Sequence, residues 1–220
     1  MAITRPPRAV LFDLDGTLLD TAPDFVLAIN ALRAEEALAP LAATVLRPHV
    51  SHGGAALICA AFNMTAAQPE FERRRLRLLD LYAHVLAQAT VPFAGVEDLL
   101  LTLETRGLPW GIVTNKPGWL TTPLLAALGL DQRAGCVIAG DTTARAKPHP
   151  EPLLAAAQAL AIRPADCLYV GDAQRDIDAA RAAGMACLVA LYGYIGSDDH
   201  PERWGGDGSI ACPQDLLAWL

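Results

Sequence analysis

Acidic side chains follow short apolar runs at two places that lie far apart in the chain. The run at 8–12 is followed by Asp13 and Asp15. A later apolar run is followed by Asp172, with Asp176 four residues further on. Carboxylates that are brought together repel one another, and a hard cation such as Mg²⁺, which prefers oxygen ligands, relieves that repulsion. If the fold brings these two places together, the residues predict a magnesium site.

A third polar stretch, Thr114-Asn115-Lys116, follows another apolar run. Lys116 and Lys147 are the two lysines among 17 basic residues, and the other 15 are arginines. A lysine ammonium is a compact charge that can approach both a carboxylate and a phosphate, whereas the planar guanidinium of arginine needs more room. Lys147, in the sequence AKPHPEP, is therefore a candidate for such a contact, and Lys116, which follows Thr114-Asn115, is a candidate substrate contact.

The apolar runs before these residues are typical of buried strands in a parallel sheet. Helical patterns separate the later runs, so strand and helix alternate from about residue 93 onward in a doubly wound α/β pattern. All strands of a parallel sheet end at the same edge, and we expect the polar stretches to meet there. The predicted strands are 8–12, 108–114, 136–139, 167–171 and 186–191, and the predicted helices are 119–128, 151–161 and 174–183.

The segment 20–90 interrupts this alternation, because it contains helical patterns and no convincing strand. Thr21 and Asp24 have the spacing of a capping box at the start of one helix. A second helical pattern covers 69–89 and carries an arginine cluster at 73–77, which we expect to be a solvated helix face. A helical insert after the first strand predicts a small cap domain.

These patterns divide the chain into two expected domains. Residues 1–18 and 92–220 are expected to form a Rossmann-like catalytic core with a doubly wound parallel sheet. Residues 19–91 are expected to form an inserted all-helical cap domain. The joints between the two are short, near 17–20 and 91–96.

Composition favours a folded protein and disfavours some classes of partner. Of its 220 residues, 53% are hydrophobic and 19% are charged, which excludes a disordered chain. The net charge of −7 disfavours nucleic acid and anionic membranes as partners. The five cysteines show no CxxC spacing, which indicates reduced thiols in a cytoplasmic protein. No apolar run reaches the ~18 residues of a membrane span, and the N-terminal residues do not resemble a signal peptide.

The ordered set of motifs resembles the haloacid dehalogenase superfamily. DLDGT at 13–17, TN at 114–115, the lysine at 147 and GDxxxD at 171–176 are similar to its four motifs. They occur in the same order and cover essentially the whole chain. The resemblance implies a Rossmann-like core with a helical cap between the first two motifs, and Mg²⁺ as the cofactor. It also implies a phosphatase reaction.

The resemblance gives the two aspartates of the first motif separate roles. Asp13 resembles the nucleophile, whose carboxylate attacks phosphorus and forms an aspartyl-phosphate. Asp15 would protonate the leaving alkoxide and later deprotonate the attacking water. Its main-chain carbonyl would also be a metal ligand.

The later motifs are implied to hold the phosphate and the metal. Thr114, the main-chain amide of Asn115 and Lys147 would bind the phosphoryl oxygens, where charge must be stabilised. Asp172 would bind Mg²⁺ together with the first motif. Asp176 would orient the metal ligands through hydrogen bonds.

Two alternatives resemble the chain less closely. A receiver domain of a signalling protein is also phosphorylated on aspartate in an α/β fold. Receivers, however, are shorter, lack a helical insert and do not carry DGT after the first strand. Sugar phosphomutases of this shape often carry valine after DG, so Thr17 favours a phosphatase.

Local sequence resembles two groups of phosphatases. LLDTAPDF resembles the phosphoglycolate phosphatases, whereas VSHGGAALI, WGIVTNKP and YGYIGSDDHPERWG resemble the phosphatases of N-acetylmuramic acid 6-phosphate. Both substrates are small phosphorylated metabolites that also carry a carboxylate, and the enzyme is expected to be a monomer or a homodimer. The candidate carboxylate-binding residues of the cap are Arg47, His49, His52, Gly53 and Gly54, and the candidate walls for a sugar are Trp119, Tyr192 and Tyr194.

Overall fold

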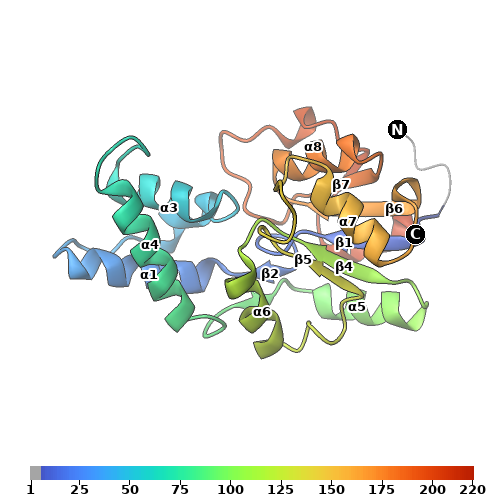
Figure 1. The fold of residues 1–220 in the computed structure, drawn as a ribbon, viewed down its shortest axis with the longest axis horizontal. Coiled ribbons are helices and arrows are strands. Elements are labelled where there is room, and N and C mark those ends of the chain that lie inside the picture. Colours follow the sequence, from blue (N-terminus) through green and yellow to red (C-terminus); the bar gives the residue numbers. More distant parts are fainter. Residues whose placement is uncertain (1–5) are drawn as a thin grey trace. The chain divides into compact units, whose positions relative to one another are not determined.

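A computed structural model describes residues 6–220 of the chain, which form two compact units (Figure 1). The first, here called the core unit, contains the chain up to Leu19 together with Pro92–Leu220. The second, the helical unit, is Asp20–Val91. The first five residues of the core segment expected at 1–18 lie outside the described residues.

The strands of the core unit are β1 (Ala9–Phe12), β4 (Trp110–Val113), β5 (Cys136–Ile138), β6 (Cys167–Gly171), β7 (Ala186–Ala190) and β8 (Gly208–Ile210). In the described part of the chain they form one six-stranded parallel sheet in the order β5-β4-β1-β6-β7-β8. β1 is central, and its Phe12 is paired with Ile112 of β4 and with Val170 of β6. The carboxyl ends of these three strands therefore lie side by side.

The helices of the core unit are α5 (Val96–Thr105), α6 (Gly118–Ala127), α7 (Glu151–Ala159) and α8 (Gln174–Ala182), with the short 3-10 helices η2 (Pro164–Asp166), η3 (Pro201–Arg203) and η4 (Pro213–Trp219). α7 and α8 pack on one face of the sheet, against alternate strand residues such as Leu11, Tyr169 and Val189. Figure 1 shows α5 and α6 on the opposite side. Both faces are covered, which is why the strands are apolar throughout.

The helical unit contains α1 (Ala22–Glu35), α2 (Ala43–Leu46), η1 (Arg47–His49), α3 (Gly53–Phe62) and α4 (Phe71–His84). α1 packs against α4, and the rings of Phe25 and Tyr82 stack with their centroids 3.9 Å apart. The chain passes between the units at β2 (Leu19–Asp20) and β3 (Val91–Pro92), which pair as a two-stranded sheet.

The arginines of α4 lie on a solvent-exposed helix face, as expected, since the side chains of Arg73 and Arg77 are 57% and 42% exposed, and they also form ion pairs. Arg73 and Arg74 form ion pairs with Glu36, and Arg77 forms one with Glu35, at N–O distances of 2.9, 2.6 and 2.6 Å. The packing of α1 against α4 brings the acidic end of α1 within reach of these guanidinium groups. The cluster therefore connects two helices of the unit.

The predicted capping box of Thr21 and Asp24 is wrong, because the Asp24 carboxylate binds residues at the other end of the helical unit. The side chain of Thr21 makes no capping hydrogen bond at the start of α1. The carboxylate of Asp24 is fully buried and accepts hydrogen bonds from the main-chain N–H of Ala89 (2.7 Å) and the hydroxyl of Thr90 (2.5 Å). Asp24 thus joins the two ends of the helical unit.

The fold class predicted from the sequence is confirmed: a parallel α/β sheet, covered by helices, with a helical insert after the first strand. The strand β8 and the β2–β3 pair are additions, because each is too short to show a pattern in the sequence. No helix within residues 6–220 is both long enough and apolar enough to cross a membrane.

Candidate active site

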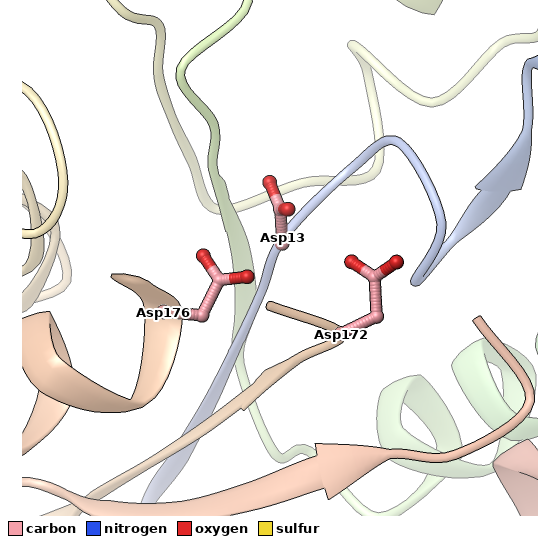
Figure 2. Close-up of side chains that lie close together, drawn as sticks. All are labelled: Asp13, Asp172 and Asp176. Carbon is pink, nitrogen blue, oxygen red and sulfur yellow. The ribbon is translucent and has the colours of Figure 1, made fainter. Parts of the chain in front are cut away.

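Three aspartates from two distant parts of the chain meet at the carboxyl edge of the sheet (Figure 2). Asp13 follows β1, Asp172 follows β6 and Asp176 lies in the first turn of α8. One oxygen from each carboxylate lies within 4.8 Å of the other two, and all three residues are buried. Because β1 and β6 are neighbours, the two acidic stretches of the sequence lie together.

Asp176 is placed by the start of α8 and by the glycine that ends β6. Its Oδ2 accepts a hydrogen bond from the main-chain N–H of Ala173, 3.1 Å away, in the first turn of the helix. A Cβ atom on Gly171 would lie 2.5 Å from the Cβ of Asp176, which is closer than real side chains approach. The glycine of the GDxxxD motif therefore lets the aspartate lie directly against the strand.

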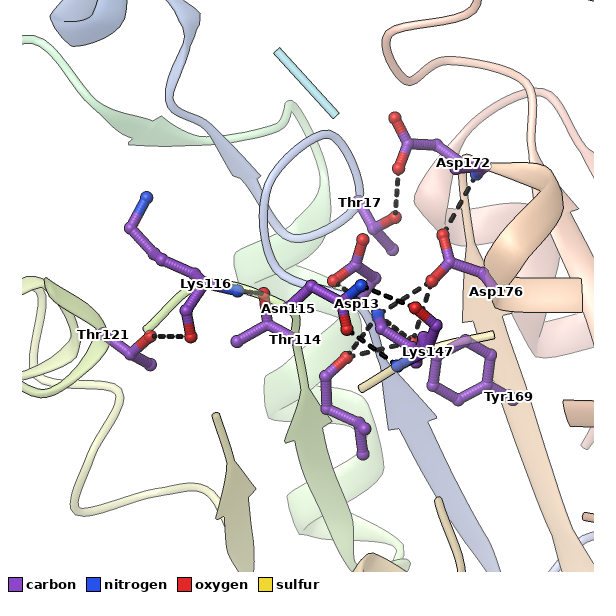
Figure 3. Close-up of polar contacts among 12 residues, drawn as sticks. Asp13, Thr17, Thr114, Asn115, Lys116, Thr121, Lys147, Tyr169, Asp172 and Asp176 are labelled. Atoms are coloured by element: carbon purple, nitrogen blue, oxygen red, sulfur yellow. Dashed lines mark hydrogen bonds and ion pairs between the residues drawn. The ribbon is translucent and has the colours of Figure 1, made fainter. Parts of the chain in front are cut away.

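The ammonium of Lys147 lies among these carboxylates (Figure 3). Its Nζ is 2.9 Å from Asp13 Oδ1 and 2.8 Å from Asp176 Oδ1. It also donates hydrogen bonds to the carbonyl of Val113 (2.7 Å) and to the hydroxyl of Tyr169 (2.8 Å). The Lys147 side chain is fully buried, so these partners offset the cost of removing an ammonium from water.

Asp13 titrates unusually for an aspartate. Burial raises the pKa of Asp13 from 3.8 to about 6, although the Lys147 ammonium opposes the rise, and the Asp176 carboxylate adds to it. The ionised form of Asp13 is therefore under-compensated by the protein itself. A divalent cation beside it would stabilise that form, and three clustered carboxylates are a donor set that suits a hard cation.

Asn115 acts on Lys147 through its side chain. Its Nδ2 donates to the carbonyl of Lys147 (2.8 Å), and its Oδ1 accepts from the main-chain N–H of the same residue (3.0 Å). Thr114 beside it is buried, and its hydroxyl accepts a hydrogen bond from the N–H of Lys116 (3.1 Å). The loop after β4 thus holds the main chain that carries the buried lysine.

Asp15 and Lys116 form an ion pair, with Nζ 3.0 Å from Oδ1. The Lys116 side chain is only 3% exposed, and the Asp15 side chain is 14% exposed. Lys116 is a candidate substrate contact from the sequence, and in this structure its ammonium contacts the second aspartate of the DLDGT motif. The structure therefore links the motifs that follow β1 and β4.

Sequence reasoning missed Tyr169 and Arg175. Burial raises the pKa of Tyr169 well above its usual value, with Asp176 and Asp13 adding to the rise, so the hydroxyl next to Lys147 stays protonated. Burial alone would lower the pKa of Arg175, but the same two carboxylates raise it, so the guanidinium stays charged. The position of Arg175 inside GDxxxD was the available signal for it; Tyr169 looked like an ordinary strand residue.

The aromatic candidates Tyr192, Tyr194 and Trp119 differ in their contacts and exposure. The main-chain N–H of Tyr194 donates to Oδ2 of Asp172 (2.9 Å), and the hydroxyl of Thr17 donates to Oδ1 of the same carboxylate (3.4 Å). The hydroxyl of Tyr192 donates to the carbonyl of Thr17 (3.1 Å). Trp119, at the start of α6, is 53% exposed. Tyr194 thus contacts the acidic cluster through its main chain.

The other candidate substrate residues belong to the helical unit. They lie in η1, in the turn after it and at the start of α3: Arg47, His49, His52, Gly53 and Gly54. Nη1 of Arg47 is 2.8 Å from Oδ1 of Asp20. Because these residues and the acidic cluster belong to different units, their contact with substrate stays a prediction.

Comparisons with known proteins bear on this site. Residues 7–184, which include all the motif residues, match the family described as haloacid dehalogenase-like hydrolase. A phosphoglycolate phosphatase of Xanthomonas campestris is 47% identical, with 98% of each chain covered. An N-acetylmuramic acid 6-phosphate phosphatase of Pseudomonas aeruginosa is 42% identical, with 96% of this chain and 93% of the relative covered.

A solved structure supports the fold. A predicted phosphoglycolate phosphatase from Haemophilus somnus superimposes with a TM-score of 0.84 at 26% identity, and 98% of each chain is covered. The similarity therefore extends over both units of the chain.

Proposed function

We infer that this chain, which belongs to the haloacid dehalogenase-like hydrolase family, is a Mg²⁺-dependent phosphatase of small metabolites. It would hydrolyse a phosphate monoester through an aspartyl-phosphate. The observation that carries the proposal is the contact of Asp13 with Lys147 beside Asp172 and Asp176. One buried site thus contains a carboxylate that can attack phosphorus, an ammonium that can hold a phosphoryl oxygen and further acids for a metal.

Asp13 is the proposed nucleophile. Its carboxylate would attack phosphorus as the ester oxygen leaves, and an aspartyl-phosphate would form. Lys147, 2.9 Å from this carboxylate, would stay beside the transferred phosphoryl group and stabilise its charge. Thr114 and the main-chain amide of Asn115, at the end of the neighbouring strand β4, are the other proposed phosphate ligands.

Asp15 is the proposed acid and base. It would protonate the leaving alkoxide and then remove a proton from the water that attacks the aspartyl-phosphate. One residue can serve both steps, because the alkoxide and the water occupy the same place. The ion pair with Lys116 supports this role, since it holds the Asp15 side chain in place while leaving it 14% exposed to solvent.

The acidic cluster fits Mg²⁺ by the chemistry of its donors. Asp13, Asp172 and the main-chain carbonyl of Asp15 would hold the ion, and Asp176 would orient the ligands. When bound, Mg²⁺ supplies positive charge that stabilises the phosphoryl oxygens. The raised pKa of Asp13 supports this assignment, because the metal-free protein does not fully compensate the ionised carboxylate.

Two alternatives lose support from the comparisons. A receiver domain does not agree with a match to a hydrolase family over residues 7–184. A sugar phosphomutase is disfavoured because the relatives described above are phosphatases that are 42% and 47% identical over nearly the whole chain. Thr17, which agrees with a phosphatase, donates a hydrogen bond to Asp172.

Phosphoglycolate is the first proposed substrate, and N-acetylmuramic acid 6-phosphate is the alternative. The name of the relative in Xanthomonas campestris supports phosphoglycolate. The name of the relative in Pseudomonas aeruginosa supports N-acetylmuramic acid 6-phosphate. Each molecule carries a carboxylate that needs a cationic or amide-rich partner. The proposed partners are the cap residues Arg47, His49, His52, Gly53 and Gly54.

The ratio of kcat/KM for the two substrates, with hexose phosphates as controls, decides between them. A preference of about a hundredfold, or ~2.7 kcal/mol of transition-state binding, identifies the substrate. Values within a few-fold of one another for all substrates would show that neither specific assignment holds. Absence of turnover with every phosphate monoester, including p-nitrophenyl phosphate, would contradict the phosphatase itself.

The compartment is proposed from the cysteines. All five are free thiols in the structure, which supports the reducing cytoplasm. Burial raises the pKa of Cys136, Cys167 and Cys187 to about 11, so these thiols stay protonated at neutral pH. The monomeric or homodimeric state stays a prediction.

A further inference from the structure

The loop after β7, Tyr192-Gly193-Tyr194, contacts the proposed metal ligand Asp172 directly. We propose that this loop is a positioning element that fixes the Asp172 carboxylate for the metal ion, so that its packing sets the metal affinity. The inference rests on the proposed function, because the metal site is part of that function.

Both oxygens of the Asp172 carboxylate have a protein partner. Oδ2 accepts the main-chain N–H of Tyr194 at 2.9 Å, and Oδ1 accepts the hydroxyl of Thr17 at 3.4 Å, as Figure 3 shows for Thr17. A carboxylate oxygen can accept more than one hydrogen bond or ligand, so these contacts are compatible with metal binding. A carboxylate held at both oxygens resists rotation, which orients it before the ion arrives.

Gly193 makes this contact possible. A Cβ atom at this position would lie 2.4 Å from the Cβ of Asp172 and 2.5 Å from the carbonyl oxygen of Gly16. Gly193 is not among the residues with positive φ, so space, and not backbone conformation, limits what fits there. Any side chain at Gly193 must push the loop away from the aspartate or move the aspartate itself.

Aromatic packing holds the loop in place. The hydroxyl of Tyr192 donates to the carbonyl of Thr17 (3.1 Å), and burial raises the pKa of Tyr192, so the phenol remains a donor. Phe93 contacts the rings of Tyr192 and Tyr194, at centroid distances of 5.4 and 6.0 Å. The N–H of Phe93 donates to the carbonyl of Leu18 (3.1 Å). The loop is therefore attached to the segment that follows Asp13.

The test compares Gly193→Ala with the matched control Gly135→Ala. A Cβ on Gly135 would lie 2.7 Å from Cδ2 of Leu160, so this substitution is also crowded. Gly135 precedes β5, however, and therefore lies at the amino ends of the strands, away from the acidic cluster. Mn²⁺ serves as the probe, with the free ion measured by electron paramagnetic resonance and displaced by Mg²⁺. We expect Gly193→Ala to weaken both affinities by about tenfold or more, and the control to change neither.

Tyr192→Phe is the second variant, because it keeps the ring against Phe93 and removes only the hydrogen bond to Thr17. We expect it to weaken metal affinity by about threefold, and we expect the variant to remain folded and to unfold in a single cooperative thermal transition. If Gly193→Ala does not fold, Tyr192→Phe decides the question. Wild-type affinity in Tyr192→Phe, or in a folded Gly193→Ala protein, would overturn the role of the loop.

The same measurements separate this inference from the proposed function. A wild-type protein that binds metal and hydrolyses p-nitrophenyl phosphate, with variants of unchanged affinity, contradicts only the positioning role. A wild-type protein that neither binds Mn²⁺ nor hydrolyses the ester contradicts the proposed function and the inference together. Asp172→Ala, which removes the carboxylate, gives the reference for a lost metal ligand.

Discussion

At the scale of single residues, the site consists of acidic side chains around the charge of one buried lysine. Lys147 contacts Asp13 and Asp176 at once and also donates to Val113 and Tyr169. A flexible ammonium can make these contacts in a small space, whereas a planar guanidinium could not adopt the same geometry. This explains the use of lysine here in a chain whose other basic residues are mostly arginine.

The role of Asp15 predicts a dependence on the leaving group. Asp15→Asn should lower kcat severely for an alkyl phosphate, because the alkoxide then leaves without a proton. The loss should be much smaller in the phosphorylation step with p-nitrophenyl phosphate, whose leaving group scarcely needs one. Single-turnover kinetics with both esters measures that step. An equal loss for both would show that Asp15 is not the acid.

The raised pKa of Asp13 predicts that metal stabilisation depends on pH. An acid with a higher pKa in the folded protein favours folding when protonated, and this contribution is lost as pH rises from the ordinary 3.8 through about 6. Mg²⁺ binds the ionised carboxylate and compensates its charge. We therefore expect Mg²⁺ to raise the melting temperature more at about pH 7.5 than at about pH 5.

Differential scanning fluorimetry at both pH values measures this effect. Asp13→Asn is the control: without metal at about pH 7.5 it should melt at a higher temperature than the wild type, because the raised pKa of Asp13 makes its ionised form unfavourable and Lys147 keeps its ion pair with Asp176. Equal Mg²⁺ shifts at the two pH values would contradict the link between Asp13 and the metal.

At the scale of elements, the sequence predicts those strands whose own residues form a recognisable apolar run. β1, β4 and β6 are continuous apolar runs followed by polar residues, and these patterns were sufficient to place Asp13 and Asp172 at one edge. β8 contains only Gly208–Ile210, and it is a strand because it pairs with β7. Such pairing depends on the neighbouring strand and leaves no pattern in the segment itself.

The site residues also differ in whether their own sequence or a neighbouring segment determines their role. The motif aspartates could be predicted because they follow strands of recognisable composition. The contact of Tyr194 with Asp172 uses a main-chain N–H, which every residue but proline possesses, so its side chain gives no indication of it. The ion pairs of α4 depend in the same way on the packing of α1, which periodicity alone does not specify.

Asn115 links two loops, and this predicts a specific defect. Asn115→Ala removes two hydrogen bonds to the main chain of Lys147, so the lysine should lose its fixed position. We expect kcat to fall by about tenfold or more, with metal affinity nearly unchanged, because no proposed metal ligand is altered. Steady-state kinetics and Mn²⁺ titration of the same protein test this. A large loss of metal affinity would contradict the assignment.

At the scale of the whole molecule, the residues for metal and phosphate belong to the core unit, whereas the candidate carboxylate-binding residues belong to the helical unit. Tyr82→Ala removes a buried ring that stacks on Phe25 inside the helical unit. It should destabilise that unit by ~3 kcal/mol in denaturant unfolding. Mn²⁺ affinity should stay at the wild-type value below the transition, and a parallel loss would show that the metal site depends on the helical unit.

The central claim is that Asp13 becomes phosphorylated during turnover. The direct measurement is acid quenching of the enzyme during hydrolysis of a ³²P-labelled monoester, followed by peptide mapping of the label. We expect a hydroxylamine-sensitive phosphate on Asp13 that requires Mg²⁺, disappears in Asp13→Asn and accumulates in Asp15→Asn when p-nitrophenyl phosphate is the substrate. An Asp13→Asn protein that still hydrolyses the ester at the wild-type rate, or a label on another residue, would contradict the account.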